Sequence, residues 1–267
     1  MNQQERLNYL LDVLLQENPE DGAWLQQQYG NSFALLRALM NIREPEPINT
    51  EFLAVQDAYL QAMTAEKGIV QANELEPAPL HEKLYLWQGD ITRLQVDAIV
   101  NAANDKLLGC WTPNHNCIDN MIHTMAGVQL RQDCAMLMAQ QGCDEPTGQA
   151  KITSAYNLPS RYVLHTVGPI VRGALTEQHQ QMLASSYRSC LELAAQQGLR
   201  SVAFCCISTG EFGFPNEPAA EIAIKTALQF LYENSTKNNT IEQIIFNVFK
   251  DEDKFIYQRL LKLVNGG

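Results

Sequence analysis

Two cysteines and a histidine lie within eight residues of one another in the segment 109–120 (GCWTPNHNCIDN). On a loop kinked by Pro113, the two thiolates and the imidazole can converge on one tetrahedral zinc ion, at about 2.0–2.3 Å per bond. A Cys110–Cys117 disulfide is the alternative, but it leaves His115 unused and is rare in a reducing compartment. We therefore expect one zinc ion held by Cys110, His115 and Cys117.

The number of protein ligands separates two roles for such a metal. Structural zinc is usually closed by four ligands, whereas catalytic zinc keeps three and leaves a position for water or substrate. Three ligands are visible locally, and Cys134 or Cys143 could supply a fourth from a neighbouring segment. His123 and His165 could also be ligands or proton shuttles, but both lie in patterned elements, so we expect hydrogen-bonded structural histidines.

Three further segments could bind a nucleotide. The glycines of 208–215 (STGEFGFP) can turn backbone N–H groups toward a diphosphate, or can form an ordinary turn. In 89–92 (GDIT), the Asp90 carboxylate could accept a hydrogen bond from the adenine amine or cap a short helical turn. The amides of 101–104 (NAAN) suit sugar hydroxyls, although asparagines at a strand end also make turns.

The elements expected to position these segments begin near residue 84. Short apolar runs there alternate with helix-length segments, which predicts an α/β domain with a largely parallel or mixed sheet. In such folds ligands bind beyond the carboxyl ends of the strands, where the polar and glycine-rich segments gather. The expected strands are 84–88, 98–101, 150–154, 162–166, 201–207 and 243–248, and the expected helices are 119–140, 178–197, 218–233 and 252–264.

The first part of the chain is predicted to be helical. Apolar residues recur at helical spacing in 7–15, 32–42 and 52–63, and two prolines, Pro45 and Pro47, separate the second helix from the third. The Glu76-Pro77-Ala78-Pro79 segment predicts a boundary. We expect a helical extension over 1–79 and a second domain over 80–267.

Composition limits the classes of function. With 46% hydrophobic and 18% charged residues, the 267-residue chain is expected to be globular. A net charge of −11 without a Lys/Arg run argues against a long nucleic-acid footprint, and neither a signal peptide nor a membrane-length apolar run is present, which predicts a cytoplasmic protein. The odd count of seven cysteines favours reduced thiols or metal ligands, with core thiols at Cys134, Cys190, Cys205 and Cys206.

Together these segments resemble the macrodomain family from about residue 84 to the carboxyl end. The hydrolysing macrodomains usually carry a run of glycines before the Asp that opens the following helix, and here Cys110 to Cys117 replaces it. That replacement resembles the zinc-containing subgroup of bacteria, which also has a helical amino-terminal extension. The matching motifs are, in order, Gly89-Asp90-Ile91, Asn101-Ala102-Ala103-Asn104, Ile118-Asp119 with Ile122-His123, His165-Thr166-Val167-Gly168-Pro169 and Ser208 to Pro215.

The resemblance implies a three-layer α/β/α macrodomain with a mixed, mostly parallel sheet, and zinc on Cys110, His115 and Cys117. Phe249 would stack on adenine, with a core aromatic as the alternative, and Phe214 or Phe212 would pack near the distal ribose. The ADP-ribose-binding residues it implies are Asp90, Ile91, Asn101, Ser208, Thr209, Gly210, Glu211, Phe212, Gly213, Phe214 and Phe249.

The activity that the resemblance implies is zinc-dependent removal of mono-ADP-ribose from Asp and Glu side chains of modified proteins. Asn104 would contact the distal ribose, and Asp119 would orient water or the ribose, support the metal ligands or cap the following helix. The resemblance also implies a partner protein modified by a sirtuin-like transferase, with a lipoylated carrier protein as a candidate. The composition predicts neither a nucleic-acid nor a membrane partner. The alternatives are a non-catalytic ADP-ribose-binding module and an O-acyl-ADP-ribose deacylase.

Overall fold

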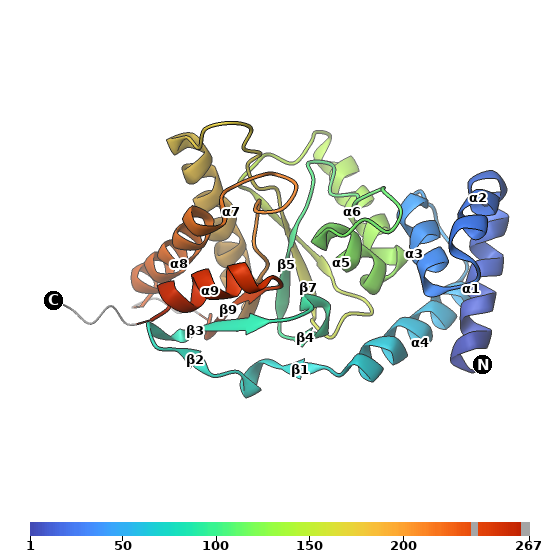
Figure 1. The fold of residues 1–267 in the computed structure, drawn as a ribbon, viewed down its shortest axis with the longest axis horizontal. Coiled ribbons are helices and arrows are strands. Elements are labelled where there is room, and N and C mark those ends of the chain that lie inside the picture. The colour runs from blue at the N-terminus through green and yellow to red at the C-terminus, as the bar shows by residue number, and fades with distance from the viewer. Residues whose placement is uncertain (236–239, 263–267) are drawn as a thin grey trace.

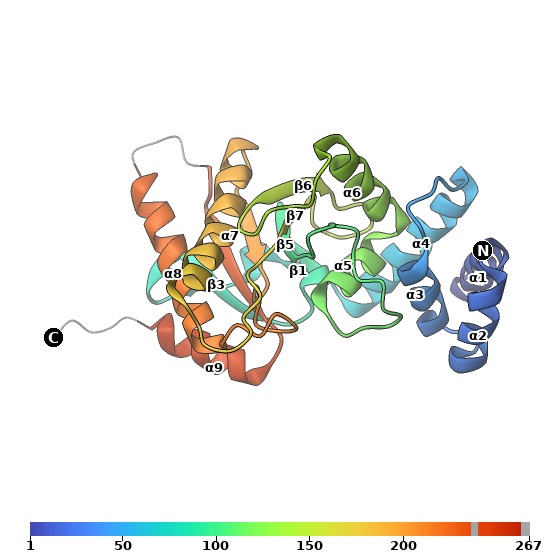
Figure 2. The ribbon, with the colours of Figure 1, turned by 90° about the horizontal axis from the view of Figure 1, so that it is seen from above.

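The computed structural model describes residues 1–235 and 240–262. The helices of these residues are α1 (Gln3–Glu17), α2 (Pro19–Tyr29), α3 (Phe33–Ile42), α4 (Thr50–Lys67), α5 (Ile118–Ala126), α6 (Val128–Gln141), α7 (Glu177–Gln196), α8 (Asn216–Glu233) and α9 (Asp251–Leu260), with 3-10 turns η1 (Ala72–Glu74) and η2 (Ile91–Arg93). Helices α1 to α4 form a bundle at one end of the molecule, and α8 and α9 lie at the other end (Figure 1). Helices α5 and α6 stand between the bundle and the central sheet (Figures 1 and 2).

The central sheet of the described residues has seven strands, in the order β2-β3-β9-β8-β5-β7-β6. The inner strands run parallel, while β2 and β6 are antiparallel edge strands. Helices cover both faces, so the predicted three-layer α/β/α fold with a mixed, mostly parallel sheet is confirmed. The strands are β2 (Pro77–Ala78), β3 (His81–Gln88), β5 (Ala98–Ala102), β6 (Ala150–Ser154), β7 (Tyr162–Thr166), β8 (Ser201–Phe204) and β9 (Gln243–Val248), and a separate parallel pair joins β1 (Val70–Gln71) to β4 (Leu94–Gln95).

Strand β8 is shorter than its apolar pattern suggests. The expected strand over 201–207 ends at Phe204, because its partners β5 and β9 pair with residues 202–204 and 201–204 and not beyond. Cys205 and Cys206 therefore follow the strand. Cys205 is buried, as expected of a core thiol, whereas Cys206 is only partly buried.

The amino-terminal helices start where polar side chains can cap them. Asn2, Ser32 and Asn49 each accept a hydrogen bond from an amide in the first turn of α1, α3 and α4. Helix α2 was not expected, because it buries only Gly22 and Leu25 and so lacks the apolar periodicity of a helix packed along its whole length.

In the part of the chain that the structure describes, buried apolar side chains form two clusters. The larger fills the space between the sheet and its helices. The smaller is made by α1 to α4 and includes Val128 from the start of α6, so the helical bundle is seated on that helix. Pro77 and Ala78, which were expected in the boundary between the two units, form the edge strand β2 beside β3.

The single helix expected over 119–140 is two helices. It breaks at Gly127, which has φ +98° and is both the C-cap of α5 and the N-cap of α6. The Val128 amide at the break donates to the Gln56 side chain of α4.

The last expected helix, 252–264, ends at Leu260 in the structure, and residues 263–264 lie outside the described residues. Among the described residues, no helix combines the length and the apolar composition needed to cross a membrane.

Candidate active site

The segments singled out in the sequence lie at one edge of the sheet. Strands β3, β9, β8, β5 and β7 are parallel, so their carboxyl ends point the same way. Segment 89–92 follows β3, Phe249 follows β9, segment 208–215 comes soon after β8, and 101–104 spans the end of β5. This edge is where ligands of open α/β sheets bind.

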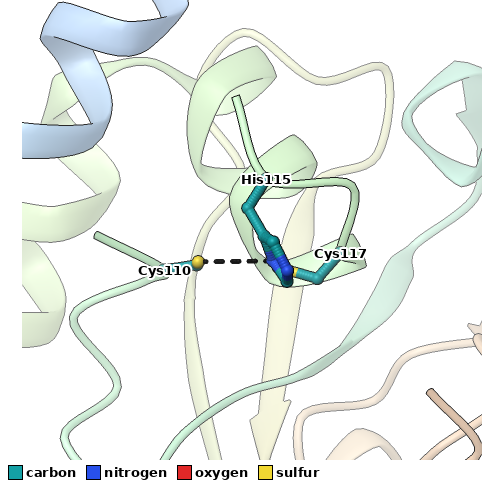
Figure 3. A group of neighbouring side chains, drawn as sticks. All are labelled: Cys110, His115 and Cys117. Atoms are coloured by element: carbon teal, nitrogen blue, oxygen red, sulfur yellow. Dashed lines mark hydrogen bonds between the residues drawn. The ribbon is translucent and has the colours of Figure 1, made fainter. Parts of the chain in front are cut away.

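Cys110, His115 and Cys117 are brought together on the loop between β5 and α5. The three side chains point toward one another (Figure 3), and their ligand atoms all lie within 4.8 Å of each other. The distance between Cys110 Sγ and His115 Nδ1 is 3.6 Å. All three side chains are partly buried, and both cysteines are free thiols, so the disulfide alternative is not formed.

The donor set fits zinc. With bonds of about 2.3 Å to sulfur and about 2.0–2.1 Å to nitrogen, sulfur and nitrogen ligands on a tetrahedral zinc stand about 3.6 Å apart, the separation seen between Cys110 and His115. Burial raises the pKa of the Cys117 thiol to about 12, so a cation that binds it must displace its proton. The two cysteines considered as a fourth ligand lie elsewhere: Cys134 belongs to a separate buried group, and Cys143 is exposed.

Asp119 lies in the first turn of α5, with its carboxylate held by two asparagines. Asn101 Nδ2 donates to Oδ1 at 2.8 Å, and Asn104 Nδ2 donates to Oδ2 at 3.3 Å. Burial raises the pKa of Asp119 to about 6, although the Asn101 hydrogen bond and Arg131 oppose the shift. The alternative role of Asp119 as a helix cap is wrong, because the N-cap of α5 is Cys117, whose sulfur accepts from the Asn120 amide at 3.4 Å.

The loop 208–215 offers backbone donors. Its own turn uses the amides of Gly213 and Phe214, which donate to the carbonyls of Gly210 and Ser208. Within the described part of the chain, the amides of Gly210, Glu211 and Phe212 make no hydrogen bond, so they are available to an anion. The Glu211 carboxylate lies 3.6 Å from His115 Nε2, which joins this loop to the loop that carries Cys110, His115 and Cys117.

Comparison with known proteins identifies the family. The family model described as Macro domain matches residues 100–223. A protein of Treponema medium named Protein-ADP-ribose hydrolase is 51% identical over 264 residues, which cover 98% of this chain and 100% of that protein. The chain belongs to the macro domain family.

Two further relatives of this macrodomain are similar over most of their length. A protein of Staphylococcus aureus (strain MRSA252), also named Protein-ADP-ribose hydrolase, is 46% identical over 95% of this chain and 94% of its own. The crystal structure of the Trypanosoma brucei macrodomain in complex with ADP-ribose superposes with a TM-score of 0.65 at 31% identity, covering 84% of this chain and 94% of that one.

Three residues expected to contact the nucleotide, Asp90, Phe249 and Phe214, have different surroundings in the structure. Asp90 caps η2, since its Oδ1 accepts from the Thr92 amide at 3.0 Å and from the Thr92 hydroxyl at 2.6 Å. Phe249 is 75% exposed, so it is not a core aromatic. Phe214 is 1% exposed and belongs to the core, which leaves the partly buried Phe212 as the aromatic of that loop able to face a ribose.

The two histidines expected to be structural are both buried, but only one is hydrogen-bonded. His165 Nδ1 lies 3.3 Å from Asn101 Nδ2, and its Nε2 lies 3.0 Å from the Thr153 hydroxyl. Neither ring nitrogen of His123 has a hydrogen-bond partner among the described residues, so that expectation is wrong for His123. Its Nε2 is 3.6 Å from the Asp119 carboxylate.

Polar side chains that contact the loop of Cys110, His115 and Cys117 were missed in the sequence. They are Arg37 and Asn41 of α3, Asn120 of α5 and Arg131 of α6, and all four are buried. The available signal was an arginine and an asparagine inside the otherwise apolar helix FALLRALMNI, because buried polar residues need specific partners.

Proposed function

We propose that this macrodomain is a zinc-dependent hydrolase that removes mono-ADP-ribose from Asp and Glu side chains of modified proteins. The observation that carries the proposal is the group of three zinc-type ligand atoms beside a loop with free amides, at the ligand-binding edge of the sheet. The names of the relatives from Treponema medium and Staphylococcus aureus, both Protein-ADP-ribose hydrolase, support the reaction class.

ADP-ribose would lie along the carboxyl edge of the sheet. The amides of Gly210, Glu211 and Phe212 would hold the diphosphate, since three successive N–H groups without a hydrogen-bond partner in the described residues suit an anion. The exposed ring of Phe249 would stack on adenine, and Asp90 would accept a hydrogen bond from its amine. The distal ribose would then reach the loop that carries the metal ligands.

Cys110, His115 and Cys117 would hold the zinc. When bound, zinc would supply Lewis-acid stabilisation of the oxygen charge that develops as the ester is cleaved. The His115 ring would be oriented by Glu211, whose carboxylate lies 3.6 Å from Nε2, as outer carboxylates commonly orient metal-bound histidines.

Asp119 and Asn104 would orient the ribose end of the substrate. The Asp119 carboxylate accepts the Asn104 side-chain amide, and the same Nδ2 also donates to the Gly109 carbonyl, so the Asn104 side chain is fixed beside the metal-binding loop. Both Nδ2 hydrogens are then engaged, and Oδ1 accepts from the Lys106 amide at 3.0 Å, so Asn104 would offer the second lone pair of Oδ1 to a sugar hydroxyl without further loss of conformational freedom. With its pKa near 6, Asp119 is mostly ionised at neutral pH and can also accept a proton from an attacking water.

The ester linkage to Asp or Glu is favoured over the N-glycosidic linkage to arginine, because a carboxylate leaving group needs less assistance. The partner would be a protein that carries mono-ADP-ribose, with a lipoylated carrier modified by a sirtuin-like transferase as the candidate suggested by the resemblance of the sequence.

The test is to measure turnover of three substrates side by side: a protein ADP-ribosylated on Glu, a protein ADP-ribosylated on Arg, and O-acetyl-ADP-ribose. We expect the highest kcat/KM for the Glu-linked protein. Faster turnover of O-acetyl-ADP-ribose would make the chain a deacylase. Binding of ADP-ribose with no turnover of any substrate by the zinc-loaded protein would make it a recognition module.

A further inference from the structure

We propose that α3 of the amino-terminal bundle positions the metal-binding loop, here residues 109–117, and that Arg37 is the positioning residue through which it acts. The inference rests on the proposed zinc site and gives the amino-terminal helices a specific role at that site. Helix α3 lies next to α5, the helix that begins where the loop ends (Figures 1 and 2).

The Arg37 guanidinium bonds both the loop, at His115, and the first turn of α5, at Asn120. Its Nη2 donates to the His115 carbonyl at 2.6 Å, which fixes the backbone of one ligand. Its Nε donates to Asn120 Oδ1 at 2.8 Å. Because the guanidinium is planar and its donors are rigidly spaced, these two contacts set the distance between the loop and the first turn of α5.

Asn120 extends the Arg37 contact to the two cysteines. Its side-chain Nδ2 donates to the Thr112 carbonyl at 3.0 Å and to the Cys110 carbonyl at 3.5 Å. Its backbone amide donates to Cys117 Sγ at 3.4 Å. One arginine of the bundle is therefore connected to all three ligands, to His115 directly and to both cysteines through Asn120.

A second pair of contacts holds the residue before His115. Asn114 has a φ of +54°, a left-handed conformation that costs energy outside glycine. Its backbone amide donates to Asn41 Oδ1 at 3.0 Å, and its side chain donates to the Ala34 carbonyl at 3.0 Å. Both partners belong to α3, so the helix stabilises the turn that aims the His115 ring.

Arg131 of α6 locks α3 against the start of the loop. Its Nη1 donates to the carbonyls of Met40 and Asn41 at the end of α3, and its Nε donates to the Leu108 carbonyl at 2.7 Å. The guanidinium also stacks on the Trp111 ring, 4.2 Å from the centroid. Burial lowers its pKa to about 10, so it remains a cation at neutral pH.

These contacts fix the position of the loop relative to α3, which attaching the bundle to the macrodomain would not by itself require. Burying two arginines costs free energy unless each donor is matched, and an apolar contact between α3 and α5 would not require that cost. The donors of Arg37 bond His115 and Asn120, and those of Arg131 bond Leu108 and the carbonyls at the end of α3, so together they join the helix to the loop and to the residues on either side of it. Elsewhere the bundle meets the rest of the chain through different polar contacts, including those of Gln56 and Asp57 of α4.

The test compares zinc affinity among full-length variants, by competition with a chromophoric chelator. We expect Arg37→Ala to weaken zinc binding by about 10- to 100-fold, the range seen when outer partners of metal ligands are removed, with ADP-ribose affinity of the zinc-free protein unchanged. Arg37→Lys keeps the positive charge but loses the two rigidly spaced donors of the guanidinium. Its zinc affinity should therefore lie between those of the parent protein and Arg37→Ala. The matched control is Arg43→Ala, which removes a buried arginine side chain of the same bundle that binds Glu17 and no residue of the loop.

Urea unfolding of the zinc-free proteins separates positioning from stability. Arg43→Ala should lower stability while its zinc affinity stays within about twofold of the parent protein. Unchanged zinc affinity in Arg37→Ala, or an equal loss in Arg37→Ala and Arg43→Ala, overturns the inference. If Arg37→Ala does not fold, Arg37→Lys and Asn41→Ala decide the question in the same way. Failure of the parent protein to bind zinc overturns the proposed metal site as well, which distinguishes the two failures.

Discussion

Two phenylalanines at the carboxyl edge of the sheet differ in burial, and the sequence around each does not show which one is buried. Phe214 closes the 208–215 turn and points into the core, whereas Phe249 follows the last strand and is exposed. Phe249 lies one residue past β9 and so outside the sheet, whereas Phe214 is turned back toward the core by a loop in which its amide donates to the Ser208 carbonyl. An exposed phenylalanine at a ligand edge is available to stack on a base.

Phe249→Ala should weaken ADP-ribose binding at least about fivefold, because stacking of a base on an aromatic ring contributes about 1–3 kcal/mol. Isothermal titration calorimetry with free ADP-ribose measures the effect. Phe255→Ala is the matched control, since Phe255 is a similarly exposed phenylalanine of α9. Equal affinity in the two variants would exclude adenine stacking by Phe249.

At the scale of elements, the sequence predicts a helix or strand correctly where the residues of that segment alone determine it. The strands over 150–154, 162–166 and 243–248 were predicted to the residue, since each is a short segment with β-branched or aromatic residues between turn residues. The break between α5 and α6 was not predicted, because Gly127 is only one residue in a periodic segment. Its conformation depends on Gln56, which is 71 residues earlier in the chain and receives the Val128 amide.

Gly127→Ala should destabilise the protein more than Gly142→Ala, by about 1 kcal/mol or more. Both glycines have positive φ and flank α6, but a Cβ at Gly127 would lie 2.5 Å from Gln56 Nε2, whereas a Cβ at Gly142 would have nothing within 4 Å. The backbone of Gly127, φ +98° and ψ 173°, is also a region that only glycine populates freely. Urea denaturation of the two variants checks this, and equal stabilities would contradict the account of the helix break.

At the scale of the whole molecule, the sequence predicts only those site residues that lie close together in one segment of the chain. Cys110, His115 and Cys117 lie within eight residues, so their types and spacing already indicated a metal. Arg37 lies 78 residues before His115, and only the packing of the bundle on α5 and α6 brings the two together. A single sequence without contacts gives no means of pairing residues at that distance.

Acid should destabilise the whole domain through its buried histidines. Burial lowers the pKa of His165 to about 3, below its ordinary value of 6.5, so the folded state favours the neutral ring. The stability from this group is complete above pH 6.5 and is lost as the pH falls from 6.5 toward 3. Between pH 7.5 and 5.5 the loss is about 1.4 kcal/mol for this one group.

The comparison with His165→Gln isolates that group from His123, which titrates in the same direction, and from Asp119, whose raised pKa acts in the opposite direction. The difference in unfolding free energy between pH 7.5 and 5.5 should be about 1.4 kcal/mol smaller in the variant. Equal pH dependence in both proteins would show that His165 can be protonated without loss of the fold.

The most direct measurement is zinc content together with hydrolysis of a Glu-ADP-ribosylated protein, for the parent chain and for Cys117→Ser, before and after treatment with a chelator. The account predicts about one zinc ion per parent chain, loss of hydrolysis on chelation, recovery on adding zinc, and neither zinc nor hydrolysis in Cys117→Ser while free ADP-ribose still binds. Full hydrolysis by the chelated parent protein, or by Cys117→Ser, would contradict it.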